Sequence, residues 1–143
     1  MRGPRPLAPS CGPPSPNAAR REEILANNLQ QMIAAGARLV LGTDTGIHAG
    51  HTFGTGEHHE LARWVQLGVS PPAAIVAATS RPAELLGIAD VGTLAVGKSA
   101  DFVVLDANPL DDIRNTRKIA RVYLRGQLFD RDAMRAKWQK ASR

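Results

Sequence analysis

Residues 39–61 read LVLGTDTGIHAGHTFGTGEHHEL, and this stretch decides the fold class that the sequence predicts. It begins inside an apolar run, residues 37–42, that no polar residue interrupts after Arg38. Continuous apolarity is typical of a strand that is covered on both faces, as in a parallel sheet under helices. The run ends in an acid, Asp44, and a glycine-rich loop follows. The stretch therefore predicts an α/β protein with a strand over 37–42 that carries an acid at its carboxyl end.

Helical patterns lie on both sides of this strand. Apolar residues from Ile24 to Ile33 recur on one helical face, and Gly36 is placed to end that helix. After the loop, Ser70 and Ser80 each stand just before a new helical pattern, at the position where a side chain can cap a helix. The predicted helices are 20–35, 57–68, 70–79 and 80–87.

The last third of the chain changes to strand patterns. A strand is predicted at 102–105, and two more lie on either side of the Arg125-Gly126 pair. A short helix, capped by Asp130 or Asp132, is predicted to follow. At the other end, residues 1–19 hold six of the ten prolines, so we expect a disordered leader there.

Charge divides the chain into an acidic middle and basic ends. Residues 22–113 hold eleven acidic and four basic groups, whereas residues 114–143 hold ten basic and two acidic groups. An acidic segment that also carries histidines fits a cation site better than a phosphate site. Solvated faces of a strand and a short helix explain the charges of the basic end more simply than a nucleic-acid site, so we expect no nucleic-acid partner.

The sequence also predicts the compartment. No apolar stretch approaches the roughly 20 residues that a membrane-spanning helix needs, and the first residues have no apolar core of a secretory signal. The single cysteine, Cys11, cannot form a disulfide within the chain. We therefore expect a cytoplasmic protein with no membrane partner.

The chemistry-bearing residues gather in the loop after the predicted strand. A carboxylate at the carboxyl end of a barrel strand, as Asp44 would be, can bind a divalent metal or move a proton during hydrolysis. His48 and His51 follow it and could touch a substrate or a metal. The structural alternatives are a turn cap for Asp44 and solvated loop positions for the two histidines. The zinc motif H-E-x-x-H is absent, because the residue that would be its second histidine is Arg63.

Four segments together resemble a known family. They are LVLGTDTG, HHELARWVQLGVSPPAAIVAATSRPAELLGI, VGTLAVGKSADFVVLDANPLDDI and RVYLRG. In this order and spacing they are similar to the C-terminal part of the metal-dependent amidohydrolase superfamily. The branch they most resemble is that of the imidazolonepropionases and the Xaa-Pro dipeptidases, and the resemblance covers about residues 20–129.

The resemblance implies an α/β architecture: the C-terminal fragment of a (β/α)8 barrel with the C-terminal part of the flanking β-sandwich. Residues 20–88 would then form the end of the barrel, with 37–42 as its eighth strand. Residues 89–129 would return to the sandwich, and 130–143 would add a basic terminal helix.

The resemblance also implies a site. Asp44 would be both a catalytic residue and a ligand of a divalent metal, most simply zinc, in the hydrolysis of an amide or other C–N bond of a small molecule or dipeptide. His48 and His51 would bind the substrate. The family's other ligands are histidines that precede this aspartate, and no histidine precedes Asp44 here. A catalytic zinc usually has three protein ligands.

Two hypotheses follow for this chain. It works as an enzyme in a homo-oligomer or with a complementing chain, or it is a noncatalytic remnant or interaction module that keeps the packing residues without the metal site.

Overall fold

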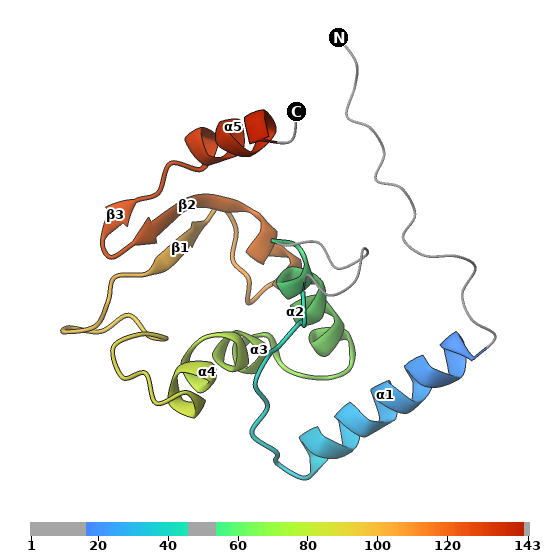
Figure 1. The fold of residues 1–143 in the computed structure, drawn as a ribbon. Coiled ribbons are helices and arrows are strands. Elements are labelled where there is room, and N and C mark those ends of the chain that lie inside the picture. The colour runs from blue at the N-terminus through green and yellow to red at the C-terminus, as the bar shows by residue number, and fades with distance from the viewer. Residues whose placement is uncertain (1–16, 46–53, 142–143) are drawn as a thin grey trace.

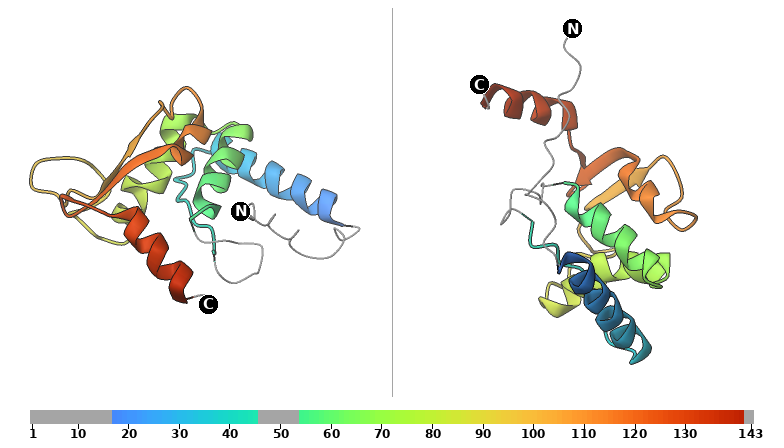
Figure 2. Two further views of the ribbon diagram at one scale, coloured as in Figure 1. Left: turned by 90° about the horizontal axis from the view of Figure 1, so that it is seen from above. Right: turned by 90° about the vertical axis from the view of Figure 1, so that its right-hand side faces the viewer.

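The computed structural model describes residues 17–45 and 54–141 (Figure 1). In the right-hand view of Figure 2, as in Figure 1, the first and last helices lie at opposite ends, and the remaining helices and the sheet lie between them. The elements, in chain order, are α1 (Ala18–Ala34), α2 (Gly56–Gln66), α3 (Pro71–Ala78), α4 (Ser80–Leu85), β1 (Phe102–Leu105), the 3₁₀ helix η1 (Ile113–Arg117), β2 (Ile119–Leu124), β3 (Gln127–Leu128) and α5 (Arg131–Ala141). None of the helices in these two ranges is long and apolar enough to cross a membrane.

The glycines that were expected to end helices do so. Gly36, Gly68 and Gly87 follow α1, α2 and α4, and each has a positive φ, between 68° and 104°. Only glycine adopts that backbone conformation without steric cost, which is why it is favoured just after a helix. Helix α1 begins at Ala18, two residues before the predicted start and inside the segment 1–19 that was expected to be a disordered leader. Residues 1–16 of that leader lie outside the described residues.

The prediction of a strand at 37–42 is wrong: the structure has no strand there. This segment pairs with no strand among the described residues, and its recorded backbone bond runs instead from Leu41 N to the carbonyl oxygen of Ala77 in α3, at 2.9 Å. A strand exists only where a neighbouring extended segment completes its hydrogen bonds. An apolar run predicts burial, and here Leu39 and Leu41 are half-buried against the helices.

The core is small and lies where α2, α3 and η1 meet. It consists of Leu61, Trp64, Val69, Ala74, Ala77 and Ile113. The two alanines are almost completely buried, at 0% and 1% exposure, because small side chains let α3 approach its neighbours closely. From α1 only Leu29 and Ile33, in its second half, pack against this cluster.

The strands form one antiparallel sheet in the order β1-β2-β3. Phe102 lies opposite Tyr123, and their rings stack with centroids 4.6 Å apart, a cross-strand pair that fixes the register. The pairing shifts by one residue between Val104 and Leu105. The predicted strands at 102–105 and around Arg125 are confirmed. A sandwich needs two sheets. The described residues form a single sheet, so the sandwich stays a prediction.

Of the residues predicted to cap helices, only Asp130 makes a capping hydrogen bond with its side chain. Ser70 stands at the N-cap of α3, yet its side chain makes no capping hydrogen bond, and the prolines that follow need no amide partner. Ser80 is the first residue of α4, whose N-cap is Thr79. At α5, the amide of Ala133 donates to Oδ1 of Asp130 at 2.8 Å, so Asp130 and not Asp132 is the cap.

Candidate functional site

Asp44 lies just after the segment 37–42, which was predicted to be a strand. The segment runs beside α3 and is held there by the Leu41–Ala77 backbone bond and by Arg81, whose guanidinium donates to the carbonyl of Leu39 at 3.3 Å. Asp44 is exposed, and its φ is +50°, a left-handed conformation that few non-glycine residues adopt. Among the described residues no group donates a hydrogen bond to its carboxylate.

The residues on either side of Asp44 contact each other and the start of α2. The hydroxyl oxygens of Thr43 and Thr45 lie 2.5 Å apart. Gly56, the first residue of α2, faces the same pair: a Cβ atom at Gly56 would lie 2.6 Å from Oγ1 of Thr45. The absent side chain thus lets the end of α2 close against the turn that carries Asp44.

His48 and His51, the predicted substrate-binding residues, lie outside the described residues. Their role stays a prediction.

The two histidines of α2 have different surroundings. His58 is half-buried, and its Nδ1 atom lies 3.0 Å from Oγ1 of Thr116 in η1. Burial lowers the pKa of His58 below its ordinary value of 6.5, and the nearby Arg117 lowers it further. His59 is exposed. Neither histidine joins Asp44 in a ligand cluster.

The described residues alone do not make a metal site. Within 17–45 and 54–141, no three or more histidine, cysteine, aspartate or glutamate side chains are grouped so that they could hold a metal ion. A catalytic zinc needs about three protein ligands. Asp44 can contribute one carboxylate, and no step of a reaction can be derived through a metal from the described residues.

One hydrogen bond within α2 was missed by the sequence analysis. The indole Nε1 of the buried Trp64 donates to Oε1 of Glu60 at 2.8 Å. Residues four apart share a helix face, so the spacing alone could have indicated this bond. Glu60 satisfies the polar atom of the largest core residue and so has a structural role.

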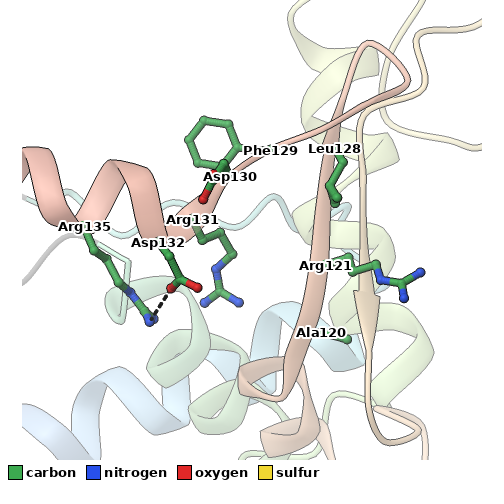
Figure 3. A pocket seen from close by; sticks show the side chains of 8 residues that line it. All are labelled: Ala120, Arg121, Leu128, Phe129, Asp130, Arg131, Asp132 and Arg135. Carbon is green, nitrogen blue, oxygen red and sulfur yellow. Dashed lines mark ion pairs between the residues drawn. The ribbon is translucent and has the colours of Figure 1, made fainter.

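A hollow of about 500 Å3 lies between the sheet and α5, far along the chain from Asp44 (Figure 3). Its charged groups are used internally: Arg131 donates to the carbonyl of Ile119 at 2.7 Å, and Arg135 forms an ion pair with Asp132 at 3.7 Å. In Figure 3 the Arg121 side chain points away from α5. No converging set of free polar groups remains, so this hollow is not the candidate site. The residues that line it are Ala120, Arg121, Leu128, Phe129, Asp130, Arg131, Asp132 and Arg135.

Comparison with known proteins identifies the relatives of this arrangement. The profile of the amidohydrolase family matches residues 10–129, which include Asp44 and both threonines beside it. The chain belongs to the amidohydrolase family. The resemblance inferred from the four sequence segments is thereby confirmed.

The amidohydrolase chain has relatives of both predicted branches. It is 36% identical over 101 residues to the imidazolonepropionase of Deinococcus radiodurans, covering 68% of this chain and 25% of that protein. The solved structure of phenylurea hydrolase B superposes with a TM-score of 0.76 and 38% identity, over 83% of this chain and 29% of that one. A Xaa-Pro dipeptidase with bound methionine gives a TM-score of 0.71 and 29% identity, over 80% and 28%.

Two facts about these relatives bear on function. The relatives include hydrolases that act on C–N bonds, and the family generally uses divalent metals. The chain spans between about a quarter and three tenths of the length of the relatives named above. What those whole proteins do is therefore a proposal for this chain.

Proposed function

We propose that this chain supplies the Asp44-bearing part of a metal-dependent amidohydrolase, which hydrolyses an amide or other C–N bond of a small molecule or dipeptide. The observation that carries the proposal is the exposed Asp44 carboxylate, free of described partners, on a turn within the segment that matches the family. In this proposal residues 20–88 belong to the end of a (β/α)8 barrel and 89–129 to the adjoining sandwich.

Asp44 would act by moving a proton. Its carboxylate can accept a proton from the attacking water and return it to the nitrogen that leaves as an amine. One proton is taken up and one is given back, so the residue is unchanged after a turnover. His48 and His51 would bind the substrate. A divalent metal, which we expect to be zinc, would polarise the scissile carbonyl when bound.

A complete site needs ligands beyond the described residues. The absence of a three-residue ligand cluster in the described ranges supports two arrangements, a homo-oligomer or a complementing chain. It equally supports a second candidate function, a noncatalytic interaction module.

Exposed apolar side chains favour association. Leu85, Leu86 and Leu94 are 72%, 70% and 71% exposed. Leu85 and Leu86 are consecutive at the end of α4, and large apolar side chains that are exposed together commonly mark a contact with another chain. Size-exclusion chromatography with light scattering should show an apparent mass that grows with concentration, and a monodisperse monomer at every concentration would contradict this part of the proposal.

Zinc binding tests the site directly. The chain would be dialysed against Zn2+, and bound zinc per chain measured for wild type, Asp44→Asn and the matched control Asp111→Asn, which changes another exposed aspartate. We expect wild type and Asp111→Asn to hold zinc and Asp44→Asn to lose it. Wild type and Asp111→Asn should also hydrolyse members of a panel of amides and dipeptides, and Asp44→Asn should not. Equal zinc in all three proteins would refute the role of Asp44, and no zinc in any would favour the interaction module.

A further inference from the structure

We propose that Thr43, Thr45 and Gly56 are positioning residues for Asp44, holding its backbone in the left-handed conformation that presents the carboxylate. We call the contact between the two threonine hydroxyls, closed by Gly56, the threonine clasp. The inference rests on the proposed function, because it assigns the clasp a purpose through Asp44.

The backbone of Asp44 needs such support. A φ of +50° brings Cβ close to the following carbonyl oxygen, which costs an L-residue free energy that glycine does not pay. Residues persist in sparsely populated conformations where the surrounding structure holds them, and these positions cluster at functional sites. A glycine at position 44 would remove the strain, but it would also remove the carboxylate.

The clasp acts on both sides of the strained residue. Thr43 and Thr45 are separated only by Asp44, so a 2.5 Å contact between their Oγ1 atoms fixes the turn between them. Threonine suits this role because a β-branched side chain has few χ1 rotamers. Both threonines are half-buried, whereas Asp44 between them is exposed. The fixed groups thus face the protein and the reactive group faces outward.

Gly56 completes the clasp from another element. A Cβ atom there would lie 2.6 Å from Oγ1 of Thr45 and 3.7 Å from Cβ of Thr43, so an alanine must displace the hydroxyl of Thr45. Gly42 provides a matched control. It lies two residues before Asp44, its φ is not positive, and a Cβ atom there would meet nothing within 4 Å.

The clasp uses no group of the Asp44 side chain. No described residue bonds to the carboxylate, so the clasp acts on it through the backbone. The clasp itself therefore occupies neither carboxylate oxygen. Residues that orient a ligand group without touching the ligand commonly change affinity between about tenfold and a hundredfold when they are altered.

The test uses the full chain and two measurements by NMR. The first is the φ angle of residue 44, from three-bond couplings and chemical shifts. The second is a titration with Mn2+ alone, which broadens resonances near a bound ion. The variants are Thr45→Val, which removes the hydroxyl at nearly constant shape, Thr45→Ser, which restores it, Gly56→Ala, and the control Gly42→Ala.

We expect wild type, Thr45→Ser and Gly42→Ala to keep a positive φ at residue 44. Thr45→Val and Gly56→Ala should lose it and weaken Mn2+ binding at Asp44 by about tenfold or more. An unchanged φ and unchanged Mn2+ affinity in Thr45→Val would overturn the inference. Rescue by serine, which keeps the hydroxyl of threonine and lacks its methyl group, would assign the effect to the hydroxyl and exclude a general loss of folding.

Asp44→Asn separates this inference from the proposed function. If Asp44→Asn binds Mn2+ as wild type does, the proposed role of the carboxylate fails, while the φ of residue 44 in Thr45→Val still decides whether the clasp exists. If Asp44→Asn loses Mn2+ and Thr45→Val does not, the proposed function stands and the positioning role fails.

Discussion

Nδ1 of His58 donates its proton to Oγ1 of Thr116, 3.0 Å away, and so joins α2 to η1. The direction follows from a third group. Thr116 has one hydroxyl proton, and it is donated to the carbonyl oxygen of Ile113 at 2.8 Å. The hydroxyl oxygen can then only accept from His58, which fixes the Nδ1–H tautomer of the neutral ring.

The burial of His58 predicts a stability that falls as the pH falls. The folded-state pKa of His58 lies below its ordinary value of 6.5, first because of burial and then because of Arg117, with Glu57 opposing. The unfolded chain therefore takes up the proton more readily. Stability is full above about pH 6.5, declines as the pH drops towards the folded-state pKa, and then levels off.

Thermal melting between about pH 7.5 and about pH 5 checks this expectation. His58→Gln should reduce the pH dependence, because glutamine does not titrate. His59→Gln is the matched control: it removes an exposed neighbour whose charge is the smallest cause of the lowered pKa of His58, so most of the pH dependence should remain. Identical pH profiles for wild type and His58→Gln would contradict the assignment.

Gly92 packs against the start of α4. Its φ is +88°, and a Cβ atom there would lie 2.9 Å from both Cβ of Ala83 and the carbonyl oxygen of Thr79. Gly97 has a similar φ, +83°, with open space around it. Both alanine variants should lose about 1–2 kcal/mol of unfolding free energy from the backbone, and Gly92→Ala should lose about 1–3 kcal/mol more from the clash. Urea unfolding measures the difference, and equal losses would show that α4 yields to the methyl group.

The Glu60–Trp64 bond predicts an asymmetry between two similar substitutions. Glu60→Gln keeps an oxygen that can accept from the indole, so it should change stability little. Glu60→Met has a similar length and no such oxygen, so it leaves Nε1 of a residue only 8% exposed without a partner. That should cost about 1–3 kcal/mol of unfolding free energy. Urea unfolding followed by circular dichroism compares the two, and equal stabilities would refute the importance of the bond.

The turn between β2 and β3 can be stabilised. Arg125 and Gly126 have φ values of +51° and +78°, and two-residue hairpins with two positive φ angles favour Asn-Gly. Arg125→Asn should raise the unfolding free energy by about 1 kcal/mol, since asparagine tolerates the left-handed region better than arginine. The bond from its amide to Oδ1 of Asp101, 2.7 Å, is a backbone bond and is retained.

Arg121→Asn is the control for this prediction. Arg121 is an exposed residue of β2 opposite Val104, so its replacement removes the same charge without a positive φ. We expect no gain in melting temperature from Arg121→Asn. A gain of equal size in both variants would assign the effect to charge and not to the backbone of the turn.

Much of the local structure could be predicted from the sequence because its causes are local. Apolar spacing indicated α1 and α2, and the glycines at 36, 68 and 87 marked where helices end. The hairpin at Arg125-Gly126 follows from turn chemistry in the same way. These features depend on residues within one or two turns of each other.

The errors and omissions depend on contacts between distant segments. Whether 37–42 forms a strand depends on a second extended segment beside it, and an apolar run does not show whether such a segment is present. Asp44 was found because it follows that run. The threonine clasp was not found, because the φ of residue 44 and the approach of Gly56 appear only when α2 is in place.

The attachment of the Asp44 segment also limits how it moves. The segment is fixed to the helices by the amide of Leu41 on Ala77, by Arg81 on Leu39, by the Arg38–Glu84 ion pair and by apolar packing of its two leucines, and not by a ladder of strand bonds. None of these contacts joins α2, α3 and η1 to one another, so we expect the segment to open locally at a free energy below that of global unfolding. The exchange of the Leu41 amide proton with solvent deuterium therefore reports how often Asp44 leaves its place, separately from the melting of the protein.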